Sequence, residues 1–342
     1  MGLQIGDIVP RRALEMSELS GKIICIDAFN ILFQFITTIR QPDGTPLMDR
    51  QGRVTSHLSG LFYRNINLLI EGIKPVYVFD GTPPEQKQRT HESRKERKLE
   101  AEHRYAEAKQ KEDVEAMAKY AKQFSYLTSE IIEESKELLN AMGIPTIDAP
   151  GEGEAQAAFI SQSKAFAVGS QDYDALLFGA PRLIQNLTLA RKRKTVSGYV
   201  YISPEIIELE KVLNHLQINQ DQLICLGILI GTDYNPKGIY GIGPRKALDI
   251  VRKMKQPTLI FKSVEDRLKE QEEQFDWQEI FELFKKPNIE KDIKIEFHGI
   301  DNKKIKQLLV SRDFSEERID NGLKKLEDGR KKVQQSDLKK WF

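Results

Sequence analysis

The sequence is poor in the residues that build disulfide frameworks and zinc sites. It has two cysteines, Cys25 and Cys225, and both lie within apolar runs. It therefore predicts neither a disulfide framework nor a cysteine-based metal site. The five histidines are scattered without the spacing of metal ligands. No apolar run approaches the roughly 20 residues that a membrane-spanning helix needs. The N-terminus lacks the pattern of a signal peptide, so we expect a cytoplasmic protein with no membrane partner.

Net charge is also lacking. Lys and Arg number 52 and Asp and Glu number 51, which leaves a formal net charge of +1, so the overall balance indicates no class of partner. The charge is nevertheless uneven, because residues 85–125 are almost continuously charged and contain neither glycine nor proline. A solvated helix with ion pairs four residues apart would explain this run, and so would a basic helix that faces phosphate groups. The position of the run, directly after an acidic motif, favours the second interpretation.

What the sequence does contain is a repeated design in which a short apolar run leads to an acidic residue. Residues 23–26 lead to Asp27, residues 75–79 lead to Asp80, and residues 165–168 lead through a turn to Asp172 and Asp174. Runs of this length bounded by turn residues fit strands buried on both faces. Helical patterns, such as those over residues 54–71 and 129–142, lie between them. This alternation predicts an α/β fold with a mainly parallel central sheet flanked by helices.

The acidic residues are expected to converge, because the carboxyl ends of parallel strands lie at one edge of a sheet. Glu152 and Glu154 follow the apolar residues 144–147, and Asp233 follows another apolar run. Any one of the seven acids could be a helix cap or a turn residue. Seven together would repel one another unless cations lie between them.

The ligand chemistry of this set narrows the choice of cation. Oxygen ligands without histidine or cysteine select hard ions such as Mg²⁺ or Mn²⁺. Seven carboxylates are too many for one Mg²⁺ but suit two ions about 4 Å apart, the arrangement for hydrolysis of a phosphodiester bond. One ion would activate the attacking water and the other would stabilise the leaving oxygen.

In this order the motifs resemble the signature blocks of the flap endonuclease/XPG family, most closely in its archaeal form. The blocks are residues 26–28, 78–84, 149–155, 170–174 and 231–234. The resemblance implies a PIN-like 5′-nuclease fold and a Mg²⁺-dependent enzyme, in which Mn²⁺ can substitute. It implies cleavage of 5′-flap, nicked or gapped DNA, with 5′-3′ exonuclease activity, in Okazaki-fragment maturation and long-patch base excision repair. The implied metal ligands are Asp27, Asp80, Glu152, Glu154, Asp172, Asp174 and Asp233.

The resemblance also assigns residues that contact the DNA near the cut. Lys87 and Arg94 would hold the scissile phosphate and stabilise its developing charge. Phe33 stands where relatives have a tyrosine that stacks on a base, a role for which a π face suffices. Gly2 would lie near the active site once Met1 is removed.

The sequence departs from the family pattern in two places. Thr82 replaces a common lysine, which removes one potential phosphate contact. Gly151 and Gly153 flank Glu152 where serine and alanine are usual, so we expect a looser loop before metal binds.

Residues 238–247 combine glycines, a proline and cations. Backbone N–H groups at such a helix start suit a phosphate, although an ordinary turn between two helices explains the pattern too. The resemblance implies a helix-two-turn-helix motif over about residues 222–256 that grips the downstream duplex with a bound K⁺. The DNA contacts assigned there are Gly241, Gly243, Arg245 and Lys246. Turn residues also predict a hairpin over residues 41–53, which the resemblance places in a wedge that bends the junction.

The C-terminus is basic and then aromatic. Gln335, Leu338, Trp341 and Phe342 match the motif that binds the sliding clamp PCNA, although a tail folded back on the core is an alternative. In the motif, one turn of 3₁₀ helix presents the three apolar residues as a plug.

We expect a monomer, apart from the clamp, with one nuclease domain over residues 1–330. It comprises an N-terminal region (1–105), a helical arch (about 82–130), an internal nuclease region (about 126–235) and the helix-two-turn-helix motif. Residues 331–342 form the tail. Other hypotheses are a sibling 5′ exonuclease or bubble-repair nuclease, a Mg²⁺-dependent phosphatase, and a non-catalytic clamp-bound junction scaffold.

Overall fold

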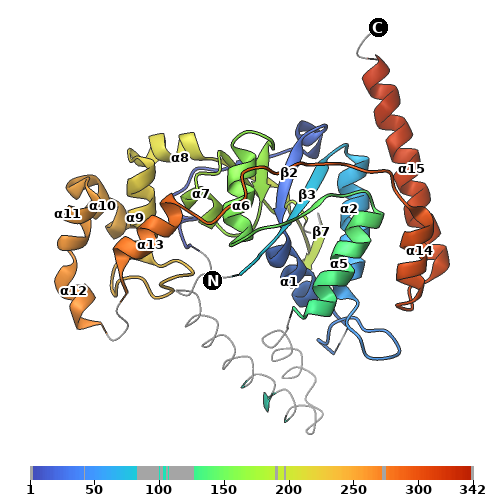
Figure 1. Cartoon of the computed structure of the whole chain (residues 1–342), viewed down its shortest axis with the longest axis horizontal. Helices are drawn as coiled ribbons and strands as arrows, with labels where there is room; N and C mark the ends of the chain where they lie inside the picture. The colour runs from blue at the N-terminus through green and yellow to red at the C-terminus, as the bar shows by residue number, and fades with distance from the viewer. Residues whose placement is uncertain are drawn as a thin grey trace.

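The computed structural model describes residues 3–41, 43–82, 100, 103–104, 107, 127–188, 192–195, 198–271 and 275–339. A seven-stranded sheet crosses the middle of this structure (Figure 1) in the order β1-β9-β6-β5-β2-β3-β4. The strands are β1 (Arg12–Ala13), β2 (Ile23–Asp27), β3 (Lys74–Phe79), β4 (Thr146–Asp148), β5 (Ala167–Gly169), β6 (Arg182–Gln185) and β9 (Glu205–Glu208). Strands β2 to β6 pair in parallel, whereas β9 runs antiparallel to β6 and β1 antiparallel to β9. The predicted mainly parallel α/β fold is confirmed.

Alternation along the central strands divides the core into two layers. In β2, Ile24 and Ile26 belong to one apolar cluster and Cys25 to the other, and in β3 Tyr77 and Val78 are divided in the same way. All five side chains are fully buried. Strands buried on both faces read as unbroken apolar runs, which is why β2, β3 and β5 could be located from the sequence.

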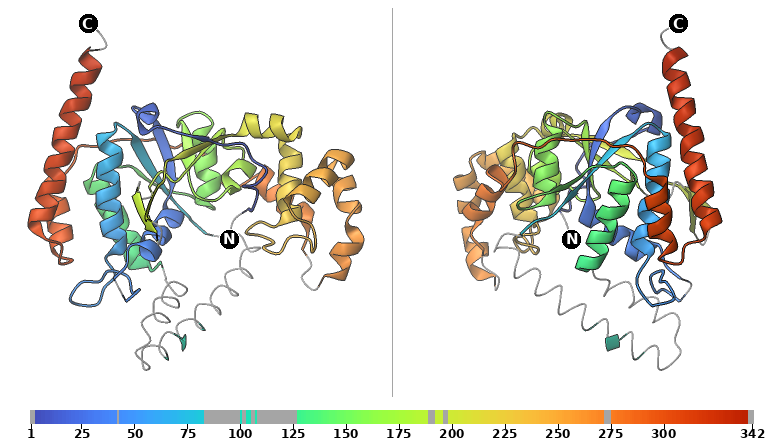
Figure 2. Two further views of the ribbon diagram at one scale, coloured as in Figure 1. Left: turned by 180° about the vertical axis from the view of Figure 1, so that it is seen from behind. Right: turned by 45° about the vertical axis from the view of Figure 1, so that its right-hand side comes forward.

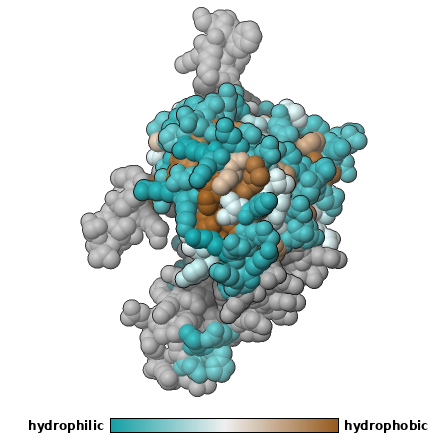
Figure 3. All heavy atoms as spheres, turned by 90° about the vertical axis from the view of Figure 1, so that its left-hand side faces the viewer, coloured by the Kyte–Doolittle hydropathy of each residue, from teal (hydrophilic) through white to brown (hydrophobic). Residues whose placement is uncertain are grey.

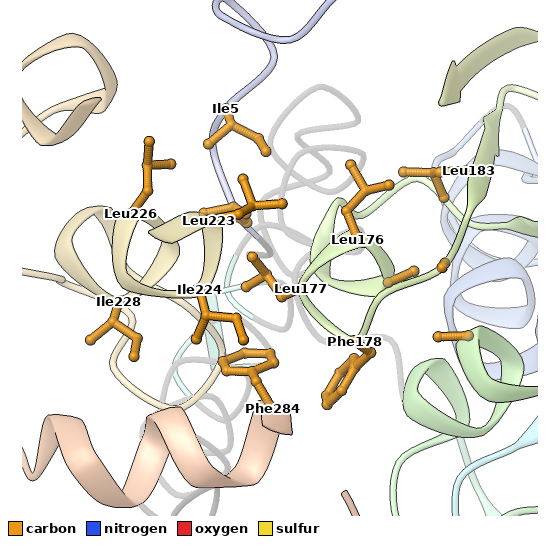
Figure 4. Packing of buried hydrophobic residues seen from close by; sticks show 14 of the residues in the cluster. Ile5, Leu176, Leu177, Phe178, Leu183, Leu223, Ile224, Leu226, Ile228 and Phe284 are labelled. Carbon is orange, nitrogen blue, oxygen red and sulfur yellow. The ribbon is translucent and has the colours of Figure 1, made fainter. Parts of the chain in front are cut away.

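Helices cover both faces of the sheet. One layer contains α1 (Ala28–Thr38), α2 (Ser56–Ile70), α5 (Ser129–Ala141), α14 (Asn302–Val310) and α15 (Glu316–Lys339). The other contains α6 (Gly153–Ser161), α7 (Asp174–Leu177), α8 (Leu209–Leu216), α9 (Gln220–Ile230), α10 (Pro244–Met254), α11 (Pro257–Lys262) and α13 (Trp277–Lys285). Figure 4 shows Leu177, Ile224 and Phe284 from α7, α9 and α13 meeting in this second layer.

The helices farthest from α15 form one end of the molecule (Figure 1), where α12 (Glu265–Glu270) follows α11. Seen from that end, hydrophobic side chains gather in the middle of the face and hydrophilic ones surround them (Figure 3). The rings of Phe261, on α11, and Trp277, on α13, stack with their centroids 4.3 Å apart. At the opposite end, the last turns of α15 extend beyond the rest of the described chain (Figure 2). Among the described residues, no helix has the length and apolar character to cross a membrane.

Two antiparallel features lie outside the parallel sheet. Strands β7 (Lys192–Thr195) and β8 (Gly198–Tyr201) form a separate two-stranded ribbon. The sequence does not predict this ribbon, because charged residues make up most of β7 and leave no apolar run there. The predicted hairpin over residues 41–53 is present, with antiparallel bridges from Arg40 to Pro46 and from Met48 to Val54.

An ion network ties this hairpin to α2, α5 and the C-terminal region. Asp49 accepts a 2.6 Å hydrogen bond from Arg53 Nε, and Arg312 Nη1 lies 3.6 Å from the same carboxylate. Arg312 also pairs with Glu134. Glu134 Oε2 is in turn 3.2 Å from Nε2 of His57, whose side chain is fully buried. The network therefore joins segments from three distant parts of the sequence.

We expect His57 to make the fold sensitive to acid. Burial, aided by the charge of Arg312, lowers the pKa of His57 to about 3 from 6.5. The ring therefore takes up a proton more readily in the unfolded chain, and stability present above pH 6.5 is lost as the pH falls toward 3. The free energy of unfolding should fall by about 1.4 kcal/mol per pH unit in this window through His57. Urea unfolding at several pH values measures this slope.

Two variants identify the source of the slope. His57→Gln should reduce it by one proton while lowering stability at neutral pH. His215→Gln, at an exposed position on α8, should leave it unchanged. If His57→Gln keeps the full slope, another group is responsible for the acid sensitivity.

Candidate active site

The seven acids come from the carboxyl ends of parallel strands and from neighbouring loops. Asp27 ends β2, Asp80 follows β3, and Glu152 and Glu154 flank the first residue of α6, after β4. Asp172 follows β5, Asp174 begins α7, and Asp233 follows α9. Asp27 and Asp174 are buried, each with 6% exposure, whereas Asp80 is exposed. The apolar run before Asp233 is thus the end of a helix, not a strand.

Asn30 links two of these acids directly. Its backbone N–H donates to Asp27 Oδ1 at 3.1 Å, and its side-chain amide donates to Asp172 Oδ2 at 2.7 Å. Asp27 is the N-cap of α1, which places Asn30 in the first turn of that helix. The sequence analysis did not identify Asn30. Three residues after an N-cap residue such as Asp27, however, is the position whose backbone N–H donates to the side chain of the cap.

Two further donors position acids at the same edge. Ser170 donates from Oγ to Glu154 Oε1 at 3.0 Å and accepts from the backbone N–H of Asp172 at 3.2 Å. The backbone N–H of Leu3 donates to Asp174 Oδ1 at 3.2 Å. The backbone at Leu3 therefore lies beside one of the acids.

Tyr234 shows that acids from different loops share one electrostatic environment. Its pKa is raised above the ordinary value by burial and then by Glu152, with smaller contributions from Asp174 and Glu154. Its ring also lies 5.3 Å from the ring of Phe284. Tyr234 thus connects the acidic edge to the apolar packing of α13.

Glycines let two loops approach closely at this edge. Gly81 donates its N–H to Gly151 O at 2.7 Å, and a Cβ on Gly81 would lie 2.0 Å from Ala149 O. The N–H of Gly153 donates to Asp80 Oδ1 at 2.5 Å, and a Cβ there would lie 2.8 Å from this oxygen. A side chain at position 153 would therefore displace the Asp80 carboxylate.

The donor set fits hard divalent cations. Its members are carboxylates from separate elements, several of them linked through Asn30, Ser170 and Tyr234, and oxygen donors of this kind select Mg²⁺ or Mn²⁺. In the part of the chain that the structure describes, no three Asp, Glu, His or Cys side chains are grouped to hold a single ion as they stand. Five of the acids instead accept hydrogen bonds from protein donors. Because like charges repel, these donors offset part of the repulsion between neighbouring carboxylates.

Helices α9 and α10, with the loop between them, lie in the region that is predicted to bind duplex DNA. Gly241 has a φ of +74°, and Gly243 is the N-cap of α10. Arg245 and Lys246 are exposed in the first turn of α10. Phe33 is 39% exposed on α1, six residues after Asp27.

Other predicted site residues fall beyond the structural description. Gly2, Lys87, Arg94, Trp341 and Phe342 lie outside the described residues, as does most of the predicted arch. The backbone at Gln335 and Leu338 is part of α15, which continues as an α-helix to Lys339.

Two protein-family models match the two parts of the chain that contain the acids. The XPG N-terminal domain matches residues 4–101, and the XPG I-region matches residues 143–233. All seven acids lie within these two ranges. The flap endonuclease 1 of Aeropyrum pernix is 50% identical over 100% of this chain and 100% of its own.

Two solved structures are also similar to this chain. Flap endonuclease-1 from Methanococcus jannaschii is 41% identical, with a TM-score of 0.75 over 96% of this chain and 98% of its own. The catalytic core of Rad2 in complex with DNA substrate is 23% identical, with a TM-score of 0.70 over 95% of this chain and 100% of its own. The second match shows a common fold.

Proposed function

Because this chain belongs to the flap endonuclease family, we propose that it hydrolyses phosphodiester bonds at 5′-flap junctions in DNA, with an associated 5′-3′ exonuclease activity. The observation that carries the proposal is the set of hydrogen bonds and electrostatic contacts that links six of the seven acids from separate loops through Asn30, Ser170, Gly153 and Tyr234. Similarity to flap endonuclease 1 extends over the full length, whereas similarity to Rad2 is one of fold. The full-length similarity favours flap cleavage over bubble repair. It also favours Okazaki-fragment maturation and long-patch base excision repair as the processes in which the enzyme acts.

The proposed cofactor is a pair of Mg²⁺ ions, with Mn²⁺ as a substitute. The ligands would be Asp27, Asp80, Glu152, Glu154, Asp172, Asp174 and Asp233. When bound, the ions supply an activated water and charge stabilisation at the leaving oxygen. Asn30 and Ser170 hold Asp172 and Glu154 in place through the hydrogen bonds described above.

The chain's other proposed site residues bind and orient DNA. Lys87 and Arg94 hold the scissile phosphate, and the exposed ring of Phe33 supports a base beside the cut. Arg245 and Lys246 on α10 bind duplex phosphates, with K⁺ at the neighbouring loop. Contacts to phosphate and sugar carry no sequence information, which suits an enzyme that acts on DNA shape.

A cleavage assay separates this proposal from its alternatives. A double-flap duplex labelled at its 5′ end should be cut near the junction only when Mg²⁺ or Mn²⁺ is added. Release of mononucleotides alone would indicate a 5′ exonuclease, and preference for a bubble would indicate a repair nuclease. Binding without cleavage would indicate a scaffold, and hydrolysis confined to small phosphate esters would indicate a phosphatase.

We further propose that the C-terminus binds the sliding clamp PCNA through Gln335, Leu338, Trp341 and Phe342. The last turns of α15 carry the first two of these positions away from the sheet (Figure 2). Large aromatic side chains are typical anchors of protein interfaces.

Deleting residues 335–342 is expected to abolish stimulation by the clamp and leave cleavage of naked flap DNA unchanged, because every proposed catalytic residue precedes this segment. Calorimetric titration with the clamp and a cleavage assay measure the two effects. Trp341→Ala combined with Phe342→Ala should reproduce the loss, while Lys339→Ala should have little effect. Unchanged clamp affinity after the deletion, or lost activity on naked DNA, would contradict the proposal.

A further inference from the structure

Tyr240 lies on the loop between α9 and α10 and is 87% exposed, more than any other large apolar side chain of the described residues. The backbone on both sides of Tyr240 is nevertheless held in place. Ile239 and Ile242 are buried on either side, and the N–H of Ile239 donates to Leu229 O at 2.9 Å. The loop thus holds an aromatic ring out into solvent on an anchored backbone, which is the geometry of a preformed contact.

The loop cannot relax easily around this ring. Gly238 has a φ of +57°, and a Cβ there would lie 2.2 Å from Ile230 O. Gly241, directly after Tyr240, has a φ of +74°. Both conformations favour glycine, so the backbone on each side of the aromatic residue is closely specified.

Two cations lie against the same loop. Lys246 Nζ donates to Gly241 O at 3.3 Å. Arg267, from α12, places its Nη1 3.5 Å from the point that a Cβ on Gly241 would occupy. Both side chains are exposed, and Arg267 forms no ion pair with another described residue. The residue that follows Tyr240 is therefore approached by cations from two separate helices.

We propose that Tyr240 and Arg267 form a further DNA contact, in which the ring lies against the sugars of one strand and the guanidinium binds an adjacent phosphate. The inference rests on the proposed function and extends the duplex-binding surface from α10 to α12. Aromatic rings among cations are typical of nucleic-acid binding sites. Lys246 and Arg267 both lie at Gly241, and Arg245 is exposed beside Lys246. Adjoining cations from two helices favour a phosphate backbone over a protein partner.

The two residues should have different salt signatures. Arg267→Ala should weaken binding to uncleaved flap DNA about threefold to tenfold and reduce the slope of log K against log salt by about one, because one phosphate contact is lost. Tyr240→Ala should weaken binding to a similar extent with an unchanged slope, because the ring carries no charge. Tyr240→Phe should retain most of the affinity. Fluorescence anisotropy in EDTA over a range of salt concentrations measures these effects.

Matched controls come from the same end of the molecule. Lys269→Ala removes a cation from the same helix that is paired with Glu265 at 2.5 Å. Leu259→Ala removes an apolar side chain that is 46% exposed on α11. Both should bind as the wild type does. Both controls should also cleave at the wild-type single-turnover rate when enzyme is saturating. Equal midpoints of urea unfolding show that all four alanine variants are folded.

Shortening the downstream duplex tests where the contact lies. With an arm of about 5 base pairs, half a helical turn, wild type and the two contact variants should bind with equal affinity. If both variants keep wild-type affinity and salt slope on the long arm, the inference is wrong although flap cleavage stands. If the wild-type protein does not cleave flap DNA at all, the proposed function itself fails.

Discussion

Replacing Asp172 by asparagine is expected to abolish cleavage of 5′-flap DNA while flap binding stays within a few-fold of wild type. The substitution keeps the shape of the side chain and removes its negative charge. Asp172 follows β5 and accepts a 2.7 Å hydrogen bond from the side chain of Asn30, so the change falls on a proposed ligand whose position is fixed. Phosphate contacts elsewhere supply most of the affinity for DNA, and they are left intact. Single-turnover cleavage and anisotropy with the same substrate measure the two quantities.

The control for this experiment is another acid at the end of a parallel strand. Asp148 ends β4 and accepts a hydrogen bond from Lys136 at 2.8 Å, but it is not among the proposed ligands. Asp148→Asn should therefore cleave normally. Turnover by Asp172→Asn in saturating Mg²⁺ would remove Asp172 from the two-ion site. Loss of DNA binding in that variant would mean that the acid supports the fold instead.

The acids could be located from the sequence because two physical regularities combine there. Strands buried on both faces give short apolar runs, as in β2 and β3, and parallel pairing brings their carboxyl ends to one edge. Asp27 and Asp80 follow directly from these rules. The apolar run before Asp233 follows neither rule. A short apolar run is compatible with a buried helix as well as with a strand, and this run is the end of the helix α9.

The partners that position the acids could not be predicted in the same way. Asn30 and Asp172 are 142 positions apart, and nothing local to either residue indicates their hydrogen bond. The same holds for Arg312, which reaches Asp49 and Glu134 from the far end of the chain. Such pairs form only after the sheet and its helices have assembled. Hydrophobic periodicity and turn residues in the sequence can therefore identify at most one residue of each pair.

The second large effect is expected at the predicted arch. Lys87→Ala should lower the single-turnover rate about a hundredfold or more with little change in the dissociation constant. Lys87 lies seven residues after Asp80, close along the chain to the acidic edge. A cation fixed beside the scissile phosphate acts on the charge that develops in the transition state. Removing one such preorganised group costs about 3 kcal/mol in comparable sites.

Separating chemistry from docking decides the role of Lys87. The rate should be measured with enzyme in excess over flap DNA, at concentrations that saturate both wild type and variant. Lys74→Ala is the matched control, because Lys74 is an exposed cation at the opposite end of β3 from Asp80, and it should cleave normally. If Lys87→Ala binds poorly yet cuts at the wild-type rate once saturated, Lys87 is a docking residue. A low rate that persists at saturation places its charge at the reacting phosphate.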